Sequence, residues 1–413
     1  MKIRRFEKEM LEGKHGYPRQ WAMQQQLQVG QFFAADCFVE VTQAHIMCDT
    51  ESLGLAGIEH LEQLASYSEE ERQVAIPTIT DPRGMDLMNY RRLNQSEDLA
   101  GRERRATTAL EAMGIMMTDT CINYQTISPP VFGEHVAFGD TGVVIYSNSV
   151  FGARSNFEGG PAALAAALTG RVPSYGYHVD SNRQATQRFK LNFDPKTLTD
   201  WGAFGAIVGE FTGDYWEVPI IEGLGDSPTS DQLKHFGAAL ASHGSVALFH
   251  LDEITPEALD FMAVAADLDG QEPISITRDQ IRAMYAKADG SIDVDVVVFA
   301  APQLSLFEIQ DIARQLDGKQ INKGTDLLIA TSPEIKAACD RFGITARIEE
   351  SGAILLSGVC FYQMYARELS EANGWKTLAS NSAKLVNIIS GYGYEPKFAT
   401  TEQCVEAAIT GRL

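Results

Sequence analysis

The sequence predicts an α/β protein built on parallel sheets. After residue 294, short apolar runs alternate with amphipathic stretches, which is the pattern of a parallel sheet with crossover helices. Earlier in the chain, apolar runs end in small polar residues, as buried strands do where they reach a ligand site. A length of 413 residues exceeds one ordinary hydrophobic core, so we expect two or three packed lobes.

The composition excludes several classes of function. Hydrophobic residues make up 45% of the chain and charged residues 22%, as in globular proteins. The net charge of −21 repels phosphate backbones and anionic membranes, so we expect neither a nucleic-acid nor a membrane partner. No apolar run has the length of a signal peptide or a membrane span, and we expect a cytoplasmic protein. The six cysteines lack paired spacing, which favours buried or catalytic thiols over disulfides.

The first 130 residues should alternate helices with short strands. We expect helices within 1–35, 57–70 and 94–113, and strands at 38–41 and 74–78. His45 follows the first strand and Arg83 the second, where ligands bind in α/β folds. Arg83 could bind a carboxylate through two hydrogen bonds. The alternatives are a structural histidine that bonds to the backbone and an exposed loop arginine.

Residues 129–192 carry the densest group of polar candidates. We expect a buried strand at 143–146 that delivers Asn148 and Ser149 to a cleft. A helix should begin at Pro161, after two glycines whose free N–H groups would suit an anion. The other polar candidates in this stretch are Arg154, Asn156, His178 and Arg183. An ordinary core with glycine-rich loops is the simpler alternative.

The middle of the chain gives weaker signals. Residues 202–209 are small and predict a closely packed helix or strand. We expect a helix at 230–242, a strand at 245–250 and a helix that starts at 255–257. Lys234 could lie on the surface of its helix.

The last third predicts a parallel unit. We expect strands at 296–299, 326–330 and 345–348, and helices at 306–316 and 333–342. Loops after parallel strands share one edge, so residues 302–303, 331–332 and 349–352 should lie together. Ser382 and Lys384 follow at a loop-to-helix junction that could hold an anion. Lys384 could instead face solvent.

Four stretches resemble the large subunit of the aconitase X family. They are V-F-G-E-H-V-A-F-G-D at 131–140, N-S-V-F-G-A-R-S-N at 148–156, Y-G-Y-H at 175–178 and S-N-S-A-K at 380–384. The resemblance covers nearly the whole chain and implies an aconitase-like, multi-lobed, three-layer α/β architecture with parallel sheets around a central cleft. We expect residues 1–290 to form lobes that carry most cleft residues, and 291–413 to form a C-terminal parallel lobe.

The resemblance also implies an iron centre, which this chain matches poorly. In the family, three cysteines hold an iron–sulfur cluster or iron. Cys121 matches one of them, whereas Ala301 and Gly352 occupy the positions that match the other two. Three or four thiolates commonly hold such a cluster, so we expect either no cofactor or an atypical iron site. Cys48, Cys360 or a histidine could supply replacement ligands.

The family contains cis-3-hydroxy-L-proline dehydratases and phosphomevalonate dehydratases, so the resemblance implies a hydro-lyase. We expect a small carboxylate substrate, such as a hydroxyproline-type acid. The candidates to bind its carboxylate are Arg83, Arg154, Arg183 and Lys384. The catalytic candidates are His45, His178 and Lys384, with either histidine as the acid. The candidates to orient the substrate are Asn148, Ser149, Asn156 and Ser382. The alternatives are a metal-free isomerase or racemase and a non-catalytic ligand-binding subunit.

The resemblance implies a partner chain as well. The family has a smaller swivelling domain that closes the cleft and carries a catalytic serine. Because the resemblance already reaches both ends of this sequence, we expect that domain as a separate small subunit whose closure excludes water.

Overall fold

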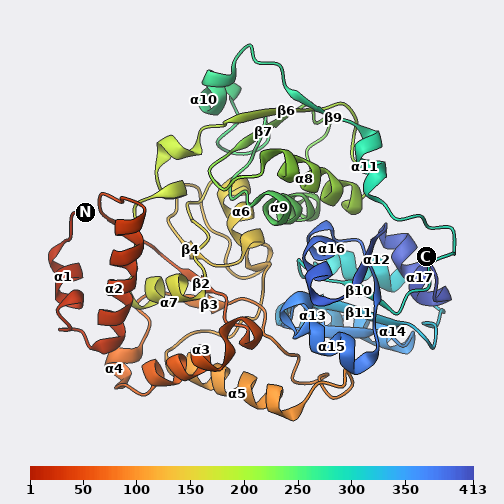
Figure 1. The fold of residues 1–413 in the computed structure, drawn as a ribbon, viewed down its shortest axis with the longest axis horizontal. Coiled ribbons are helices and arrows are strands. Elements are labelled where there is room, and N and C mark those ends of the chain that lie inside the picture. The colour runs from red at the N-terminus through yellow and green to blue at the C-terminus, as the bar shows by residue number, and fades with distance from the viewer.

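The computed structural model describes residues Met1 to Leu413 and contains four sheets, three of them parallel throughout. Figure 1 shows the N-terminal third on the left, the middle of the chain at the top and the C-terminal third on the right. The predicted α/β fold with parallel sheets is confirmed.

The first sheet has the strand order β3-β2-β4. Its strands are very short: β2 (Ala44–Ile46), β3 (Thr78–Thr80) and β4 (Ala137–Phe138). A separate antiparallel pair joins β1 (Phe38–Glu40) to β5 (Arg171–Pro173). The surrounding helices are α1 (Arg5–Leu11), α2 (Tyr17–Phe32), α3 (Thr50–Ala65), α4 (Glu69–Arg72), α5 (Glu97–Ala112), η1 (Asn123–Gln125), α6 (Thr141–Val150) and α7 (Gly160–Thr169). Apolar side chains of α3, α5 and α7 form one core with β2.

The second sheet has the order β8-β7-β6-β9. Its strands are β6 (Gln187–Leu191), β7 (Pro219–Glu222), β8 (His250–Leu251) and β9 (Ile274–Ile276). The helices are η2 (Gly176–His178), η3 (Asp180–Arg183), α8 (Leu198–Thr212), α9 (Ser230–Gly244), α10 (Phe261–Ala265), η4 (Ala266–Leu268) and α11 (Arg278–Met284). Helices α8 and α9 approach so closely that a Cβ on Gly205 would lie 2.2 Å from the carbonyl oxygen of Phe236. This contact explains the small residues at 202–209, which are helical.

The third sheet has the order β12-β11-β10-β13-β14. Its strands are β10 (Val296–Phe299), β11 (Asp326–Thr331), β12 (Ile354–Ser357), β13 (Thr377–Ser380) and β14 (Glu395–Phe398). The helices are α12 (Leu306–Gln315), α13 (Pro333–Arg341), α14 (Ile344–Glu350), η5 (Phe361–Gln363), α15 (Ala366–Asn373), α16 (Ala383–Ile389), η6 (Ser390–Tyr392) and α17 (Thr401–Thr410). The alternation of strands and helices predicted after residue 294 is confirmed for β10, α12, β11 and α13.

Two predicted strands are helices. The apolar run at 143–146 belongs to α6, which Asp140 caps and which is buried on nearly every side. A helix buried all round has the same continuous apolar pattern as a buried strand, so the pattern could not separate them. The run at 345–348 belongs to α14, and the strand follows only at β12.

Other boundaries also differ from the predictions. The strand placed at 74–78 begins at Thr78, and the strand placed at 245–250 begins only at His250. No helix starts at 255–257. The next helix is α10, which begins at Phe261. His45 lies within β2 rather than after a strand.

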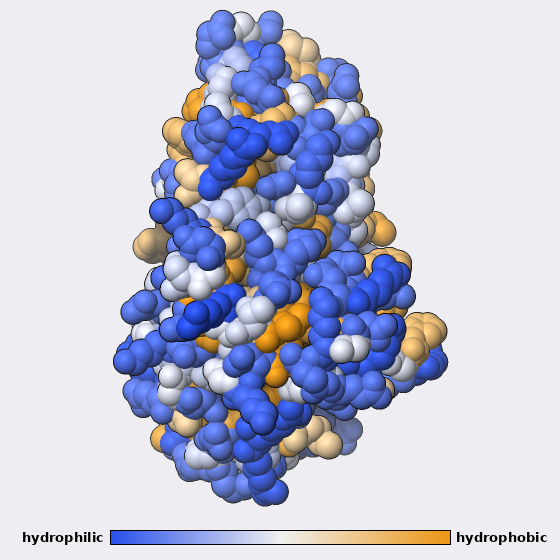
Figure 2. Space-filling view, turned by 90° about the vertical axis from the view of Figure 1, so that its right-hand side faces the viewer, coloured by the Kyte–Doolittle hydropathy of each residue, from blue (hydrophilic) through white to orange (hydrophobic).

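The face of the molecule in Figure 2 is mostly hydrophilic, and its hydrophobic residues gather mainly in a recess across the middle. No helix combines the length and the apolar character that crossing a bilayer requires.

Candidate active site

The carboxyl ends of the first and third sheets face each other. Several hydrogen bonds cross between them, among them those from Lys384 to Asp140, from Gln363 to Asp81 and from the amide of Cys121 to Gln303. Each of these three bonds joins a residue that follows a strand of one sheet to a residue near the carboxyl edge of the other. Ligands of α/β proteins bind at such edges, so this junction is the candidate active site.

Lys384 and Asp140 form a buried ion pair. The Nζ atom lies 3.1 Å from Oδ2 of Asp140, and neither side chain is more than 4% exposed. Oδ1 accepts the N–H groups of Gly142 and Val143. Burial would raise the pKa of Asp140, but Lys384 and these donors hold it below its ordinary value. Burial would lower the pKa of Lys384, but Asp140 raises it above its ordinary value. The pair is therefore charged, and the solvent-facing alternative for Lys384 is wrong.

His45 and Asp81 lie together in neutral forms. Nε2 of His45 donates to the carbonyl of Thr120 at 2.8 Å, which leaves Nδ1 as a buried acceptor without a partner. Burial lowers the pKa of His45 below its ordinary value. Oδ1 of Asp81 lies 3.5 Å from Nε2 of His45, and burial followed by repulsion from Asp140 raises the pKa of Asp81 well above its ordinary value. Burial thus favours the neutral form of both groups, whereas His45 was expected to act as the acid.

Two buried cysteines, Cys121 and Cys360, lie at the same junction. Cys121 and Cys360 belong to one buried cluster, in which the Cys360 thiol neighbours that of Cys121. Burial, followed by the neighbouring Cys360, raises the pKa of Cys121 well above its ordinary value. The N–H of Gln303 donates to Sγ of Cys121 at 3.4 Å. Cys121 is therefore a protonated thiol held against the loop that follows β10.

The structure corrects one of the three presumed iron ligand positions. Gly352 lies before β12, where Arg92 donates to its carbonyl, and so belongs to the amino end of the third sheet. Cys360, which follows the carboxyl end of β12, is the cysteine that shares a buried cluster with Cys121. Ala301 does lie at the junction, where its carbonyl accepts the hydroxyl of Ser382 at 2.5 Å.

The donor set does not fit a cluster held by three thiolates. Cys121 and Cys360 supply two sulfur atoms, and Ala301 supplies only a methyl group at the third position. Cys48 instead lines a small apolar cavity with Trp21 and Leu61. No three histidine, cysteine, aspartate or glutamate side chains are arranged to hold a metal ion.

Arg83 lies at the same junction but is already paired. Its Nε lies 3.0 Å from Oδ2 of Asp119, whose Oδ1 accepts the hydroxyl of Thr80. Burial raises the pKa of Asp119 to about 6 even though Arg83 lowers it. Arg83 is therefore a partly buried ion-pair residue, and the exposed-loop alternative is wrong.

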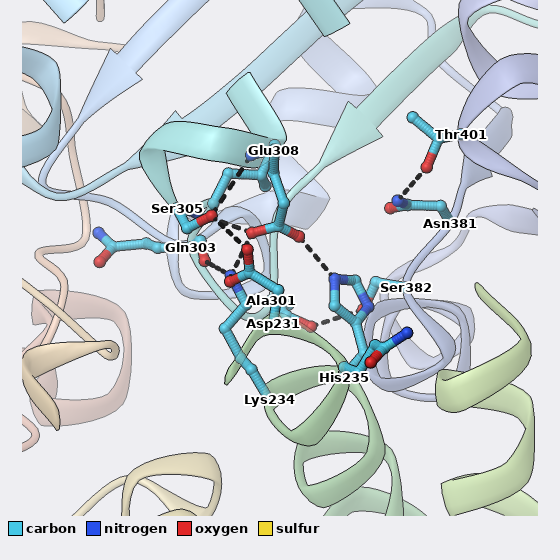
Figure 3. A network of polar contacts seen from close by, with 12 residues as sticks. Asp231, Lys234, His235, Ala301, Gln303, Ser305, Glu308, Asn381, Ser382 and Thr401 are labelled. Atoms are coloured by element: carbon cyan, nitrogen blue, oxygen red, sulfur yellow. Dashed lines mark hydrogen bonds and ion pairs between the residues drawn. The ribbon is translucent and has the colours of Figure 1, made fainter. Parts of the chain in front are cut away.

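A buried network supports the loop after β10 (Figure 3). Lys234 is buried, so its placement on a helix surface is wrong. Its ammonium contacts Glu308 and Asp231 and donates to the carbonyl of Gln303 at 3.2 Å. His235 lies 2.7 Å from the other oxygen of Glu308. Burial would raise the pKa of Glu308, but Lys234 and His235 lower it to about 2, so the carboxylate is charged.

Another group of predicted residues lies between the first and second sheets and bonds to the protein itself. Asn148 bonds to the backbone of Ser155 and Ala247, and Ser149 accepts the N–H of Phe249. Asn156 accepts from the N–H of Tyr177 and the hydroxyl of Tyr215. Arg183 is 2% exposed, and its guanidinium donates to Glu257 and to two carbonyls. These contacts hold loops in place and leave few donors for a ligand.

His178 and Arg154 lie in this second group. Nδ1 of His178 lies 2.9 Å from Nδ1 of His135, and burial followed by the charge of His135 lowers the pKa of His178 to about 3. Arg154 pairs with the exposed Asp180. The structure therefore joins Lys384, His45, Cys121, Ser382 and Arg83 at one junction, and it does not bring His178, Arg154 or Arg183 into contact with them.

Sequence reasoning missed Asp81, Asp140, Tyr362 and Gln363 as members of the junction, whereas Gln303 lies beside Thr331 at the strand ends as expected. The Tyr362 ring lies 5.6 Å from Nζ of Lys384. Asp81 and Asp140 each follow a strand of the first sheet within two residues. An acidic residue after successive strands was the available signal, but strands of two or three residues leave no periodic pattern to locate it.

Comparisons with known proteins agree along the whole chain. Family models of the aconitase X first, second and third domains match residues 1–181, 185–286 and 294–410. The phosphomevalonate dehydratase large subunit of Methanothermobacter thermautotrophicus is 35% identical over 94% of this chain and 93% of its own. The corresponding subunit of Methanocaldococcus jannaschii is 32% identical over the full length of both.

Two further similarities bear on activity and fold. The cis-3-hydroxy-L-proline dehydratase of Pseudomonas aeruginosa is 29% identical over 98% of this chain but only 70% of its own length. The crystal structure of Thermococcus kodakaraensis aconitase X in its holo-form matches 99% of this chain and all of its own, with a TM-score of 0.86 and 29% identity.

Proposed function

Because this chain belongs to the aconitase X family of dehydratases, we propose that it is the large subunit of an enzyme that removes water from a small hydroxy acid. The observation that supports this most strongly is the buried Nδ1 of His45, which has no partner, in a side chain that lies beside Asp81 and near the ion pair of Lys384 with Asp140. Loss of water needs a base, an acid and a cation that holds the substrate carboxylate.

Each group has a defined role in this proposal. Nδ1 of His45 takes the proton next to the carboxylate, the carbon–oxygen bond breaks as the double bond forms, and Asp81 protonates the departing hydroxyl to give water. The step leaves an imidazolium beside a carboxylate. After the product leaves, Nδ1 of His45 gives its proton to solvent and Asp81 takes a proton from solvent, which restores the starting state while Nε2–H stays on the carbonyl of Thr120. Lys384 uses one of its three donors on Asp140 and offers the others to the substrate carboxylate.

The charges of the junction favour a hydroxyproline-type substrate over a phosphorylated one. Both candidate cations of the junction are already paired with a carboxylate, Arg83 with Asp119 and Lys384 with Asp140. A phosphorylated acid brings additional negative charge and would need unpaired cations. A zwitterionic hydroxy acid needs only one for its carboxylate.

A small partner subunit completes the proposed enzyme. Relatives that match this chain end to end are named large subunits, whereas this chain spans 70% of the longer Pseudomonas aeruginosa dehydratase. Tyr362 is the half-buried member of the junction and lies over Lys384. We propose that substrate enters on the side of Tyr362 and that the small subunit then closes over it and excludes water.

For the test, this chain is tagged in the cells that naturally make it, and the complex is purified by that tag so that a native partner subunit is retained. The complex is incubated with cis-3-hydroxy-L-proline and, separately, with phosphomevalonate, and the products are identified by mass spectrometry. We expect one water to be lost from the hydroxyproline-type acid. Exchange of a carbon-bound hydrogen in deuterated water without loss of water would show an isomerase or racemase instead. No reaction with either acid would contradict the proposal.

A further inference from the structure

Gln303 is the most highly connected side chain at the junction. It is completely buried. Its Nε2 lies within 3.2 Å of three carbonyl oxygens, those of Asp119, Thr331 and Val359, and its Oε1 accepts the N–H of Cys121. These partners belong to three different segments: the loop at 119–121, the carboxyl end of β11 and the loop that follows β12. One carboxamide therefore ties together the loops that carry Cys121 and Cys360.

The loop that carries Gln303 is itself fixed from behind. The Lys234 ammonium donates to the Gln303 carbonyl and is neutralised by Glu308, as Figure 3 shows. On the other side, the Ser382 hydroxyl donates to the carbonyl of Ala301. The backbone on both sides of Pro302 is thus anchored by buried polar groups, so the carboxamide projects from a rigid support.

The same turn lacks the sulfur that a three-thiolate site would require. Cys121, Cys360 and Ala301 belong to one buried cluster, and of the three only the alanine carries no sulfur. Metal–thiolate bonds would hold three loops in one arrangement. Here hydrogen bonds from a single carboxamide connect those loops without them.

We infer that Gln303 is a positioning residue that preforms this site, and that the chain holds its active loops by this carboxamide rather than by an iron–sulfur cluster. Ala301 and Gln303 lie in the same turn. Ala301 has no thiol to act as a third ligand, and the side chain of Gln303 hydrogen-bonds to the other loops. The inference concerns the site of the proposed dehydratase. The metal content and the hydrogen-exchange rates of backbone amides are measured without substrate. The inference can therefore fail while the proposed dehydratase activity stands, or the reverse.

The first test measures metal uptake by the complex under anaerobic, reducing conditions. Wild-type protein is incubated with ferrous iron and sulfide, desalted and analysed for both elements and for visible absorption. We expect no more iron or sulfide than in the Cys121→Ser variant. Uptake by wild-type protein that disappears in both Cys121→Ser and Cys360→Ser would overturn the inference.

The second test restores the missing sulfur. Ala301→Cys places a third thiol beside the remaining two, and we expect it to gain iron, sulfide and absorption in the visible range. Ala300→Cys is the matched control, because it adds a buried thiol one residue away and should gain none. If Ala301→Cys takes up no cluster, the three positions do not form the ligand triangle, and that outcome also overturns the inference.

The third test addresses the carboxamide. Gln303→Leu keeps a similar volume but removes the hydrogen bonds, so we expect faster hydrogen exchange at the amide of Cys121 and in the loop at 358–360, with an unchanged rate in β10. Gln320→Leu, at an exposed glutamine of the same domain, is the control. Unchanged exchange at Cys121 in Gln303→Leu would contradict the positioning role.

Discussion

The ammonium of Lys384 lies 3.1 Å from the carboxylate of Asp140, and this buried pair joins the third sheet to the first. Asp140 also caps α6, so one carboxylate fixes both a helix and a cation from a distant part of the chain. The ammonium of Lys384 therefore both stabilises the junction and is the cation that would bind a substrate carboxylate.

Removing one partner of this pair should be costly. Lys384→Met leaves Asp140 buried and uncompensated, so we expect the free energy of unfolding to fall by about 3–5 kcal/mol. Adding Asp140→Asn keeps the cap of α6 but removes the stranded charge, and should recover much of that loss. Urea denaturation measures both changes, with Lys323→Met, at an exposed lysine, as the control. Equal stability of the single variant and wild-type protein would show that the pair contributes little.

The two candidate histidines should behave differently. His45→Gln removes the free Nδ1 acceptor, so we expect turnover to fall by about 10²–10⁴-fold, the usual contribution of a general base. His178→Gln loses the contact with His135, at a place where no contact reaches Lys384 or Asp81. Its turnover per folded molecule should stay near the wild-type value. If His178→Gln lost far more turnover than His45→Gln, His178 rather than His45 would be the catalytic base.

Stability should depend on pH through Glu158. This carboxyl is buried, its Oε1 has no hydrogen-bond partner, and burial raises its pKa to about 7. Since the folded pKa exceeds the unfolded value of 4.5, its favourable contribution is complete below pH 4.5 and is lost as the pH rises through 7.

The variant Glu158→Gln imitates the protonated form. We expect it to raise the free energy of unfolding at pH 8 by up to about 3 kcal/mol and to change it little at pH 4.5. The exposed Glu349→Gln should show no such difference between the two pH values. Destabilisation at pH 8 would mean that the ionised Glu158 has a favourable partner in the assembled enzyme.

Arg183 should prove structural rather than substrate-binding. Its guanidinium is fully engaged with Glu257 and two carbonyls, so Arg183→Met should lower the free energy of unfolding by about 3–5 kcal/mol. Glu257→Gln should weaken the same pair and destabilise the protein as well. Neither change should alter KM measured on folded enzyme. A large rise in KM for Arg183→Met alone would return this residue to the substrate site.

The sequence was most informative where local patterns were long. The four-residue β10 and the six-residue β11, each followed by a capped amphipathic helix, give the strand and helix signals in the correct order. The short β2, β3 and β4 do not, and for that reason the aspartates after β3 and β4 escaped notice. The wholly buried α6 was mistaken for a strand because its apolar residues leave no polar face.

The assignment of the thiols shows why spacing alone fails. Taking 345–348 as a strand placed Gly352 at the carboxyl edge of the sheet. Once that segment is recognised as α14, β12 becomes the strand and Cys360 takes the edge position. Polar candidates such as Asn148 and Arg183 were misleading for another reason: buried polar side chains must be hydrogen-bonded, and most of their partners here are backbone groups of distant segments.

The most direct test of the proposed site compares two purified complexes, one with wild-type chain and one with Lys384→Met/Asp140→Asn. Both are incubated with the hydroxyproline-type acid, loss of water is measured by mass spectrometry, and folding is checked by urea denaturation. We predict that the wild-type complex removes water and that the folded double variant does not. Equal rates of water loss in the two complexes would show that the chemistry does not take place where the first and third sheets meet.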